Sequence, residues 1–131
     1  MTYRINAKHL TNVQQLPAGE RYDYFVKRVA DWQEAWTVEG DRGWLTGTDD
    51  EGVIHVPLWA HPLFAEMCAT GNCSNGRIMR VGLRELTDKM LPQLESDHYR
   101  VSVMPIPPGT GVPVEPGRLR KDLLSELAKI E

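Results

Sequence analysis

The chain has 131 residues, of which 41% are hydrophobic and 25% are charged, and this composition is ordinary for a globular protein. We therefore expect one domain over residues 1–131, with a core that needs neither disulfides nor a cofactor. The net charge of −3 argues against nucleic-acid binding, which needs a clustered basic surface. The sequence has no apolar run of roughly 18 residues and no signal-peptide pattern, so we expect a cytoplasmic protein without membrane contact.

Two helices are predicted before the first strand. Asn6 can cap a short helix, because Leu10 and Val13 follow at a spacing that puts them on one face. A longer helix is predicted over residues 17–31, because its apolar residues recur at the i, i+3, i+4, i+7 spacing. These residues, which we expect in the core, are Tyr22, Phe25, Val26, Val29 and Trp32.

Three short strands are predicted next, over residues 35–38, 44–48 and 53–58. Turns rich in glycine and acidic residues separate them, so we expect an antiparallel meander. The acidic run Asp49-Asp50-Glu51 is a weak candidate for a cation site, because no glycine and bidentate glutamate of a calcium loop follow it. A hairpin tip in solvent is the simpler interpretation.

Residues 53–66 form the most distinctive part of the sequence. They read as a strand that turns sharply at Trp59 and enters a helix after Pro62. His55 lies within this strand and His61 follows the turn. Ligand crevices often open where a strand ends in this way. Because the chain reverses at Trp59, we expect this side chain to be partly exposed.

The remaining elements alternate between strands and helices. Strands are predicted over residues 77–81, 99–104 and 112–114, a helix over 83–94, and a last helix from residue 115. Pro92 is expected to kink or end the helix in which it lies. The predicted fold class is therefore α/β, or more strictly α+β. We expect a single mixed, mainly antiparallel sheet of about five strands, covered by four to five helices.

Several short motifs give the chain a family resemblance. They are Arg-Tyr-Asp-Tyr-Phe-Val at residues 21–26, Asp-Trp-Gln-Glu-Ala-Trp at 31–36 and Val-Pro-Leu-Trp-Ala-His-Pro at 56–62. From about Tyr22 onward the chain resembles the domain of unknown function 2750 family. That resemblance implies a single-domain bacterial cytoplasmic protein and carries over no catalytic residue. A weaker likeness, to SseB-like proteins, lies in the strand that bends into a helix.

No catalytic motif is recognisable. Cys73 and His61 lie at opposite ends of a predicted helix, about 15 Å apart, which is too far for a nucleophile and its base. A metal site built from His55 and His61 would need the corner to fold back on itself. The alternatives are that His55 is a half-buried strand residue and that His61 caps the following helix. Cys68 is predicted to be a buried free thiol.

The sequence therefore favours a non-enzymatic module that binds another protein or a second copy of itself. The candidate contact residues are large aromatics, the histidine of the corner and the Pro-Gly loop, namely Trp44, Trp59, His61, Pro107 and Gly109. We expect no cofactor and no metal. The alternative is a small-molecule or metal-dependent activity centred on His55, Trp59 and His61.

Overall fold

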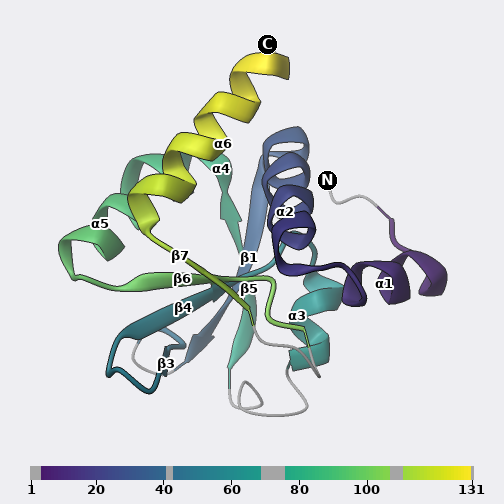
Figure 1. Cartoon of the computed structure of the whole chain (residues 1–131). Coiled ribbons are helices and arrows are strands. Elements are labelled where there is room, and N and C mark those ends of the chain that lie inside the picture. The colour runs from purple at the N-terminus through teal and green to yellow at the C-terminus, as the bar shows by residue number, and fades with distance from the viewer. Residues whose placement is uncertain (1–3, 41–42, 69–75, 107–110, 131) are drawn as a thin grey trace.

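The computed structural model describes residues 4–40, 43–68, 76–106 and 111–130 (Figure 1). Its helices are α1 (Ala7–Gln14), α2 (Ala18–Trp32), α3 (Pro62–Cys68), α4 (Leu83–Glu85), the π-helical turn η1 (Leu86–Met90), α5 (Leu91–Ser96) and α6 (Pro116–Ile130). Its strands are β1 (Glu34–Gly40), β2 (Gly43–Trp44), β3 (Gly47–Thr48), β4 (Ile54–Leu58), β5 (Arg77–Gly82), β6 (Arg100–Val103) and β7 (Val112–Val114). Among the described residues, no helix is long and apolar enough to cross a membrane.

The predicted mixed α+β class is confirmed, but the strands form two sheets rather than one. The first sheet has the order β2-β1-β5 and the second the order β3-β4-β6-β7. Among the described strands, only the β4–β6 pair is parallel, so the pairing is mainly antiparallel as expected. The sheets are joined by one isolated bridge, in which Trp36 and Trp59 exchange two backbone hydrogen bonds of 2.8 Å.

The predicted strand 44–48 is where the single-sheet expectation fails. Its first part pairs with β1, and the last bond of that ladder runs from the Leu45 N–H to the Val38 carbonyl, at 2.8 Å. Its second part, β3, pairs instead with β4. The strand thus changes partner after Leu45. Among the described residues, β1 and β4 are joined by the backbone bridge of Trp36 and Trp59 and by the Thr37 hydroxyl, which donates to the Pro57 carbonyl at 2.8 Å.

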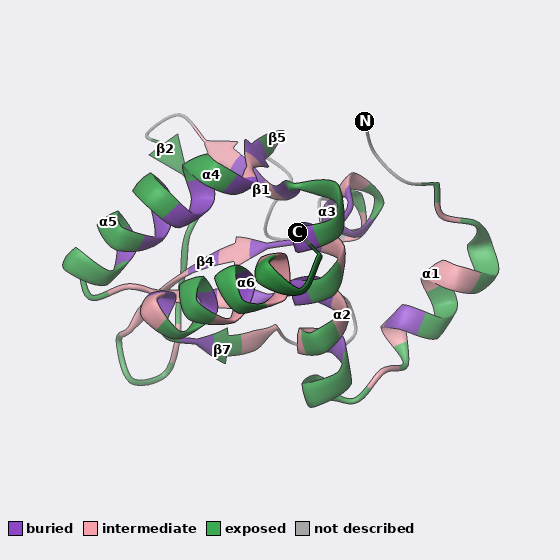
Figure 2. Cartoon of the chain, turned by 90° about the horizontal axis from the view of Figure 1, so that it is seen from above, coloured by how far each residue is buried: buried purple, intermediate pink, exposed green. Residues whose placement is uncertain are grey.

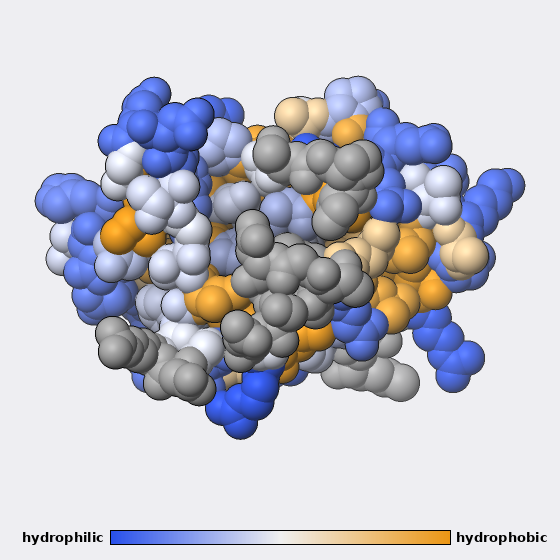
Figure 3. All heavy atoms as spheres, turned by 90° about the horizontal axis from the view of Figure 1, so that it is seen from below, coloured by the Kyte–Doolittle hydropathy of each residue, from blue (hydrophilic) through white to orange (hydrophobic). Residues whose placement is uncertain are grey.

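The helices lie mainly on one side of the sheets. α2, α6 and the α4–α5 segment are on the upper side in Figure 1, and the view from above shows α2 beside α6 (Figure 2). α1 lies at the periphery. Seen from below, hydrophobic side chains are interspersed with hydrophilic ones (Figure 3). The largest fully buried apolar side chains come from β4, from the segments after β4 and β6, and from the helices α2, α3, η1, α5 and α6: Phe25, Leu58, Trp59, Phe64, Leu86, Leu91, Leu94, Met104, Ile106, Leu119 and Leu123.

Local signals explain most helix boundaries. The Asn6 side chain accepts the His9 N–H at 2.8 Å and so caps α1, as predicted. α2 ends at Gln33, whose left-handed φ of 56° turns the chain directly into β1. Pro92 does not end the helical segment, which continues without a break to Ser96. Instead, the π-helical turn directly before Pro92 widens the backbone where proline cannot donate a hydrogen bond.

Candidate functional site

Trp59 is completely buried, so the expectation that it is partly exposed is wrong. Its indole N–H donates to the Pro105 carbonyl at 2.9 Å, and its backbone bridges Trp36. The reversal of the chain at Trp59 is therefore covered by the segment after β6 and by β1. The Trp59 side chain is packed at the junction of the two sheets and has no exposed surface for a partner.

His61 is also buried, with 6% of its surface exposed. Its Nδ1 accepts the Leu63 N–H at 3.1 Å, which satisfies a free donor at the start of α3. Its ring meets Phe64 edge to face, with centroids 6.2 Å apart. This geometry agrees with the interpretation of His61 as a helix cap.

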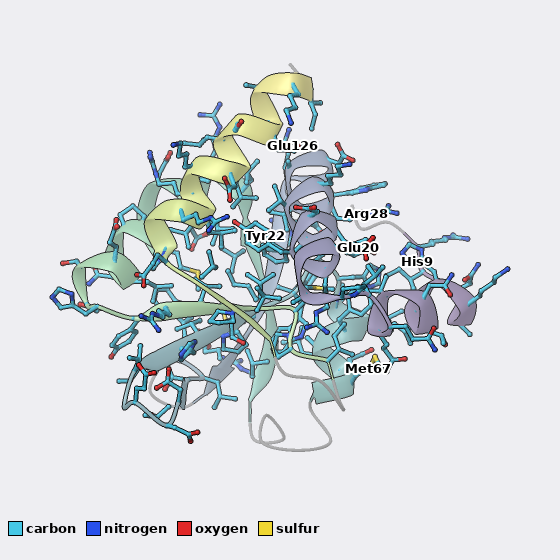
Figure 4. The ribbon with its side chains drawn as sticks, in the orientation of Figure 1. His9, Glu20, Tyr22, Arg28, Met67 and Glu126 are labelled. Carbon is cyan, nitrogen blue, oxygen red and sulfur yellow. The ribbon has the colours of Figure 1, made fainter. Side chains whose placement is uncertain are left out.

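A small aromatic cluster lies where α1 and α2 approach the start of α3. His9 Nε2 lies 2.8 Å from the Tyr24 hydroxyl, and Tyr24 meets Phe64 edge to face at 6.1 Å. The Arg28 guanidinium stands 5.2 Å from the Tyr24 ring centre, and Figure 4 shows His9 and Arg28 on the same side of α2. Burial, and then the positive charges of Arg28 and His61, lower the pKa of His9. The cluster attaches α1 to the rest of the fold.

His55 faces a different part of the molecule. Its Nε2 lies 2.7 Å from Asp49 Oδ2, while Asp49 Oδ1 accepts the N–H groups of Glu51 and Val53, both at 2.9 Å. The hydrogen bond from His55, followed by those from the backbone, lowers the pKa of Asp49. The acidic run is thus a hairpin tip in which Asp49 is hydrogen-bonded within the hairpin itself. His55 is a half-buried strand residue.

The residues of the predicted corner therefore do not converge on one site. His55 bonds to Asp49, Trp59 to Pro105, and His61 to the α3 backbone. Within the described ranges, no group of three or more His, Cys, Asp or Glu side chains is placed to hold a metal ion.

The other candidate contact residues are not gathered together either. Trp44 on β2 is 36% exposed and remains available to a partner. Pro107 and Gly109 lie outside the described residues, as do Cys73 and the side chain of Cys68.

A hollow that the sequence did not predict lies on another face of the described structure. It is a cleft of about 860 Å³ between α2, α6 and β7, within the size range of ligand sites. Apolar side chains on α2 and β7 line it, including Val26 and Val112–Val114. Tyr22 points from α2 toward α6 (Figure 4), and its hydroxyl donates to Asp122 Oδ2 at 2.5 Å. Burial and the Asp122 carboxylate raise the pKa of Tyr22, which keeps the hydroxyl protonated as a donor.

The walls of the cleft carry charges of both signs. α6 contributes two ion pairs, Arg118 with Asp122 at 3.7 Å and Lys129 with Glu126 at 3.3 Å. α2 contributes charged side chains that line the cleft but pair with none of these, namely Glu20, Asp23 and Lys27. Figure 4 shows Glu20 and Glu126 on the two facing helices. The cleft thus combines apolar side chains with charged walls.

A partial signal for this cleft exists in the sequence. Polar residues recur every three or four positions along α6, from Arg118 to Lys129, and mark a face that is not core. Tyr22, which was expected in the core, is half-buried. It is the first of the regularly spaced apolar residues of α2, whereas Phe25, the next one, is fully buried. What the spacing could not supply is that α2 and α6, almost a hundred residues apart, lie side by side.

Comparison with known protein families identifies the family of this chain. Residues 22–123 match the family model described as "Protein of unknown function (DUF2750)". The chain belongs to the DUF2750 family. No curated protein matches it, and nothing in these comparisons supports the likeness to SseB-like proteins.

The DUF2750 match covers all seven strands and the tryptophan bridge between the sheets. It includes both Tyr22 and Asp122, whose hydrogen bond joins the walls of the cleft. It leaves out α1, and with it His9 of the aromatic cluster. The matched region thus contains the central part of the cleft, whereas α1 lies outside it.

Proposed function

We propose that this DUF2750 chain is a non-enzymatic module that binds a protein, and that the α2–α6–β7 cleft is its main binding site. The observation that carries this proposal is the cleft itself, about 860 Å³ in volume, with an apolar floor and charged, exposed walls. Hydrophobic floors with polar rims are typical of protein-recognition surfaces. His55, Trp59 and His61, the residues of the alternative site, are engaged in hydrogen bonds within the protein instead.

The candidate contact residues divide between two roles in this proposal. Trp59 and His61 act indirectly, because they are buried and hold the sheets and α3 in place. Trp44 is a possible second contact, since exposed tryptophans are frequent anchors at interfaces. It cannot share the cleft, because β2 and β7 lie on opposite sides of the molecule (Figure 2).

Site-specific crosslinking tests the proposal in cells that produce the protein. A photoreactive benzoylphenylalanine at Ser125, an exposed position in the cleft wall, is expected to capture a defined protein. The same group at Ser96, an exposed position on α5, is the matched control. A covalent homodimer would identify a second copy as the occupant, and mass spectrometry would identify any other partner.

Binding of the captured partner is then measured with purified proteins. Ser125→Trp, which fills the cleft from its rim, is expected to weaken binding at least about tenfold, a loss of about 1.4 kcal/mol. Ser96→Trp should leave binding unchanged. Equal adducts from both crosslinking positions, or equal affinities of both tryptophan variants, would show that the cleft is not the binding site.

The alternative function, a small-molecule or metal-dependent activity at His55, Trp59 and His61, is favoured by no specific contact. It predicts a metal-dependent rise in melting temperature that His55→Ala abolishes. Metal analysis of the purified protein with a melting scan decides between the two.

A further inference from the structure

The charges of the cleft are not all balanced within the protein. On α6, Arg118 is paired with Asp122 and Lys129 with Glu126. On α2, neither Glu20 nor Asp23 has a side-chain hydrogen bond or an ion pair with any residue that the structure describes. Both side chains are exposed and both line the cleft. Lys27 of the same wall is also unpaired among the described residues, so these three side chains, two negative and one positive, leave a net charge of −1 that remains available to a ligand.

These carboxylates lie at one end of the cleft. α2 and α6 run side by side, and both begin near β7 (Figure 1). Glu20 and Asp23 lie in the half of α2 closest to β7, whereas Lys27 follows one turn beyond Asp23. A cation bound beside Glu20 and Asp23 would be attracted by both and would stay away from Lys27 and Lys129. The unbalanced charge therefore selects a positively charged group at the β7 end.

The shape of the cleft favours an extended chain. The α6 wall from Arg118 to Lys129 contains twelve residues, and the eleven helical rises between them span about 16 Å. An extended peptide rises about 3.3 Å per residue, so about five residues fill this length. The floor offers apolar contacts from Val26 and from β7, where Pro113 has no N–H to offer as a strand partner. The occupant is thus expected to lie along the cleft through its side chains and not to extend the sheet.

We propose that the cleft holds an extended protein segment of about five residues that carries a Lys or Arg side chain, with Glu20 and Asp23 receiving the cation. This inference rests on the proposed function and gives its partner a chemical class. Glu20 also lies in the first turn of α2, where a carboxylate is favourable for the helix. Asp23 lies beyond that turn and has no such role.

Peptide titrations followed by amide NMR spectra test this proposal. The probe is acetyl-Ala-Lys-Val-Ala-Ala-amide, and peptides with Gln or Glu in place of Lys are the matched probes. The Lys peptide is expected to shift signals of α2, α6 and β7 and to bind about three- to tenfold more tightly than the Gln peptide. The preference should vanish near 1 M salt, where the screening length is about 3 Å.

Variants of the protein locate the effect. The double variant Glu20→Gln, Asp23→Asn is expected to remove the Lys preference, whereas Glu51→Gln at the exposed hairpin tip should keep it. Asp23→Asn alone should lower the preference for the Lys peptide while leaving Glu20, and with it the first turn of α2, unchanged. Melting curves of each variant separate lost binding from lost folding.

Each outcome of the titration has a distinct meaning. Equal binding of the Lys and Gln peptides in the cleft, or a preference for Glu, would overturn the cationic class and leave the binding cleft standing. Amide signals that shift only outside the cleft, or signals that shift with none of the peptides, would overturn this inference. The crosslinking at Ser125 would then test separately whether the cleft binds a protein. A concentration-dependent dimer without peptide, abolished by Ser125→Trp, would show a second copy as the occupant instead.

Discussion

Every polar group of Trp59 is hydrogen-bonded to another group of the protein. Its backbone N–H and carbonyl bond to Trp36, and its indole N–H donates to the Pro105 carbonyl. The single side chain therefore connects β1, β4 and the segment after β6. This explains why a residue at a chain reversal, where exposure is the natural expectation, is fully buried.

We predict that Trp59→Ala lowers the free energy of unfolding by about 3–5 kcal/mol, because it removes a large buried side chain. Trp59→Phe keeps most of the volume but leaves the Pro105 carbonyl without its donor, so a loss of about 1–3 kcal/mol is expected. Urea denaturation measures both. Trp44→Ala, at an exposed position, is the control and should change stability by no more than about 0.5 kcal/mol. Equal losses at Trp44 and Trp59 would contradict the assigned burial.

His9 makes the attachment of α1 sensitive to pH. Its pKa is lowered in the folded protein, so below the ordinary value of 6.5 the unfolded chain takes up a proton first. The stabilisation that His9 provides is complete above about pH 6.5 and is lost as the pH falls through its folded pKa. The groups facing it are Tyr24, Arg28 and His61, and the latter two only reinforce the effect.

We therefore expect amide exchange in α1 to speed up relative to the core between about pH 7.5 and pH 5.5, after correction for intrinsic rates. His9→Gln, which keeps a hydrogen-bonding side chain but does not titrate, should flatten this dependence. An unchanged pH response in His9→Gln would assign the effect to another group.

At the scale of elements, Gly111 lies where β7 begins close beside β6, and the space around it decides which residue fits there. A Cβ at Gly111, just before β7, would lie 1.9 Å from Ser102 Oγ, 3.1 Å from Ser102 Cβ and 3.2 Å from Pro105 Cβ. Rotation of Ser102 relieves the first contact but neither of the others. A Cβ at Gly19 in α2 would meet nothing within 4 Å.

Gly111→Ala is accordingly expected to destabilise the protein by about 1–3 kcal/mol, because β6 and β7 must separate to admit the methyl group. Gly19→Ala, the matched substitution, should stabilise it by up to about 1 kcal/mol, since alanine favours the helix. The shift of the urea midpoint measures both, and shifts of the same sign would contradict this assignment.

The whole molecule is held together by a core that both sheets share. Its buried residues include Val38 of β1, Val56 of β4 and Leu119 of α6, all in one contiguous cluster. The sheets themselves meet at one backbone bridge only. Side-chain packing, rather than continuous strand pairing, must therefore couple the two halves.

From this we predict one cooperative unfolding transition, as expected for a single domain. Tryptophan fluorescence reports on the junction of the sheets through Trp59, and far-ultraviolet circular dichroism reports mainly on the helices. Their urea curves should coincide. Curves with separate midpoints would show that the sheets unfold independently and would contradict the one-domain expectation.

The sequence by itself determined the local order of this protein. Apolar spacing predicted α2 and α6, Asn6 predicted the start of α1, and alternating residues predicted β4 and β6, because these signals act between near neighbours. Short motifs such as Val-Pro-Leu-Trp-Ala-His-Pro were sufficient for the family. The interpretation of His61 as a helix cap also needed only neighbouring residues.

Only the tertiary structure decided where the functional surfaces lie. Burial of Trp59 depends on Pro105, 46 residues away, and the cleft depends on Tyr22 meeting Asp122 across 100 residues. Such contacts leave no periodic signal in the sequence, because they depend on how helices and strands pack against one another in the folded protein. The corner at residues 59–62 therefore proved to be a structural junction, while the cleft formed between two helices whose separate sequences gave no sign of being neighbours.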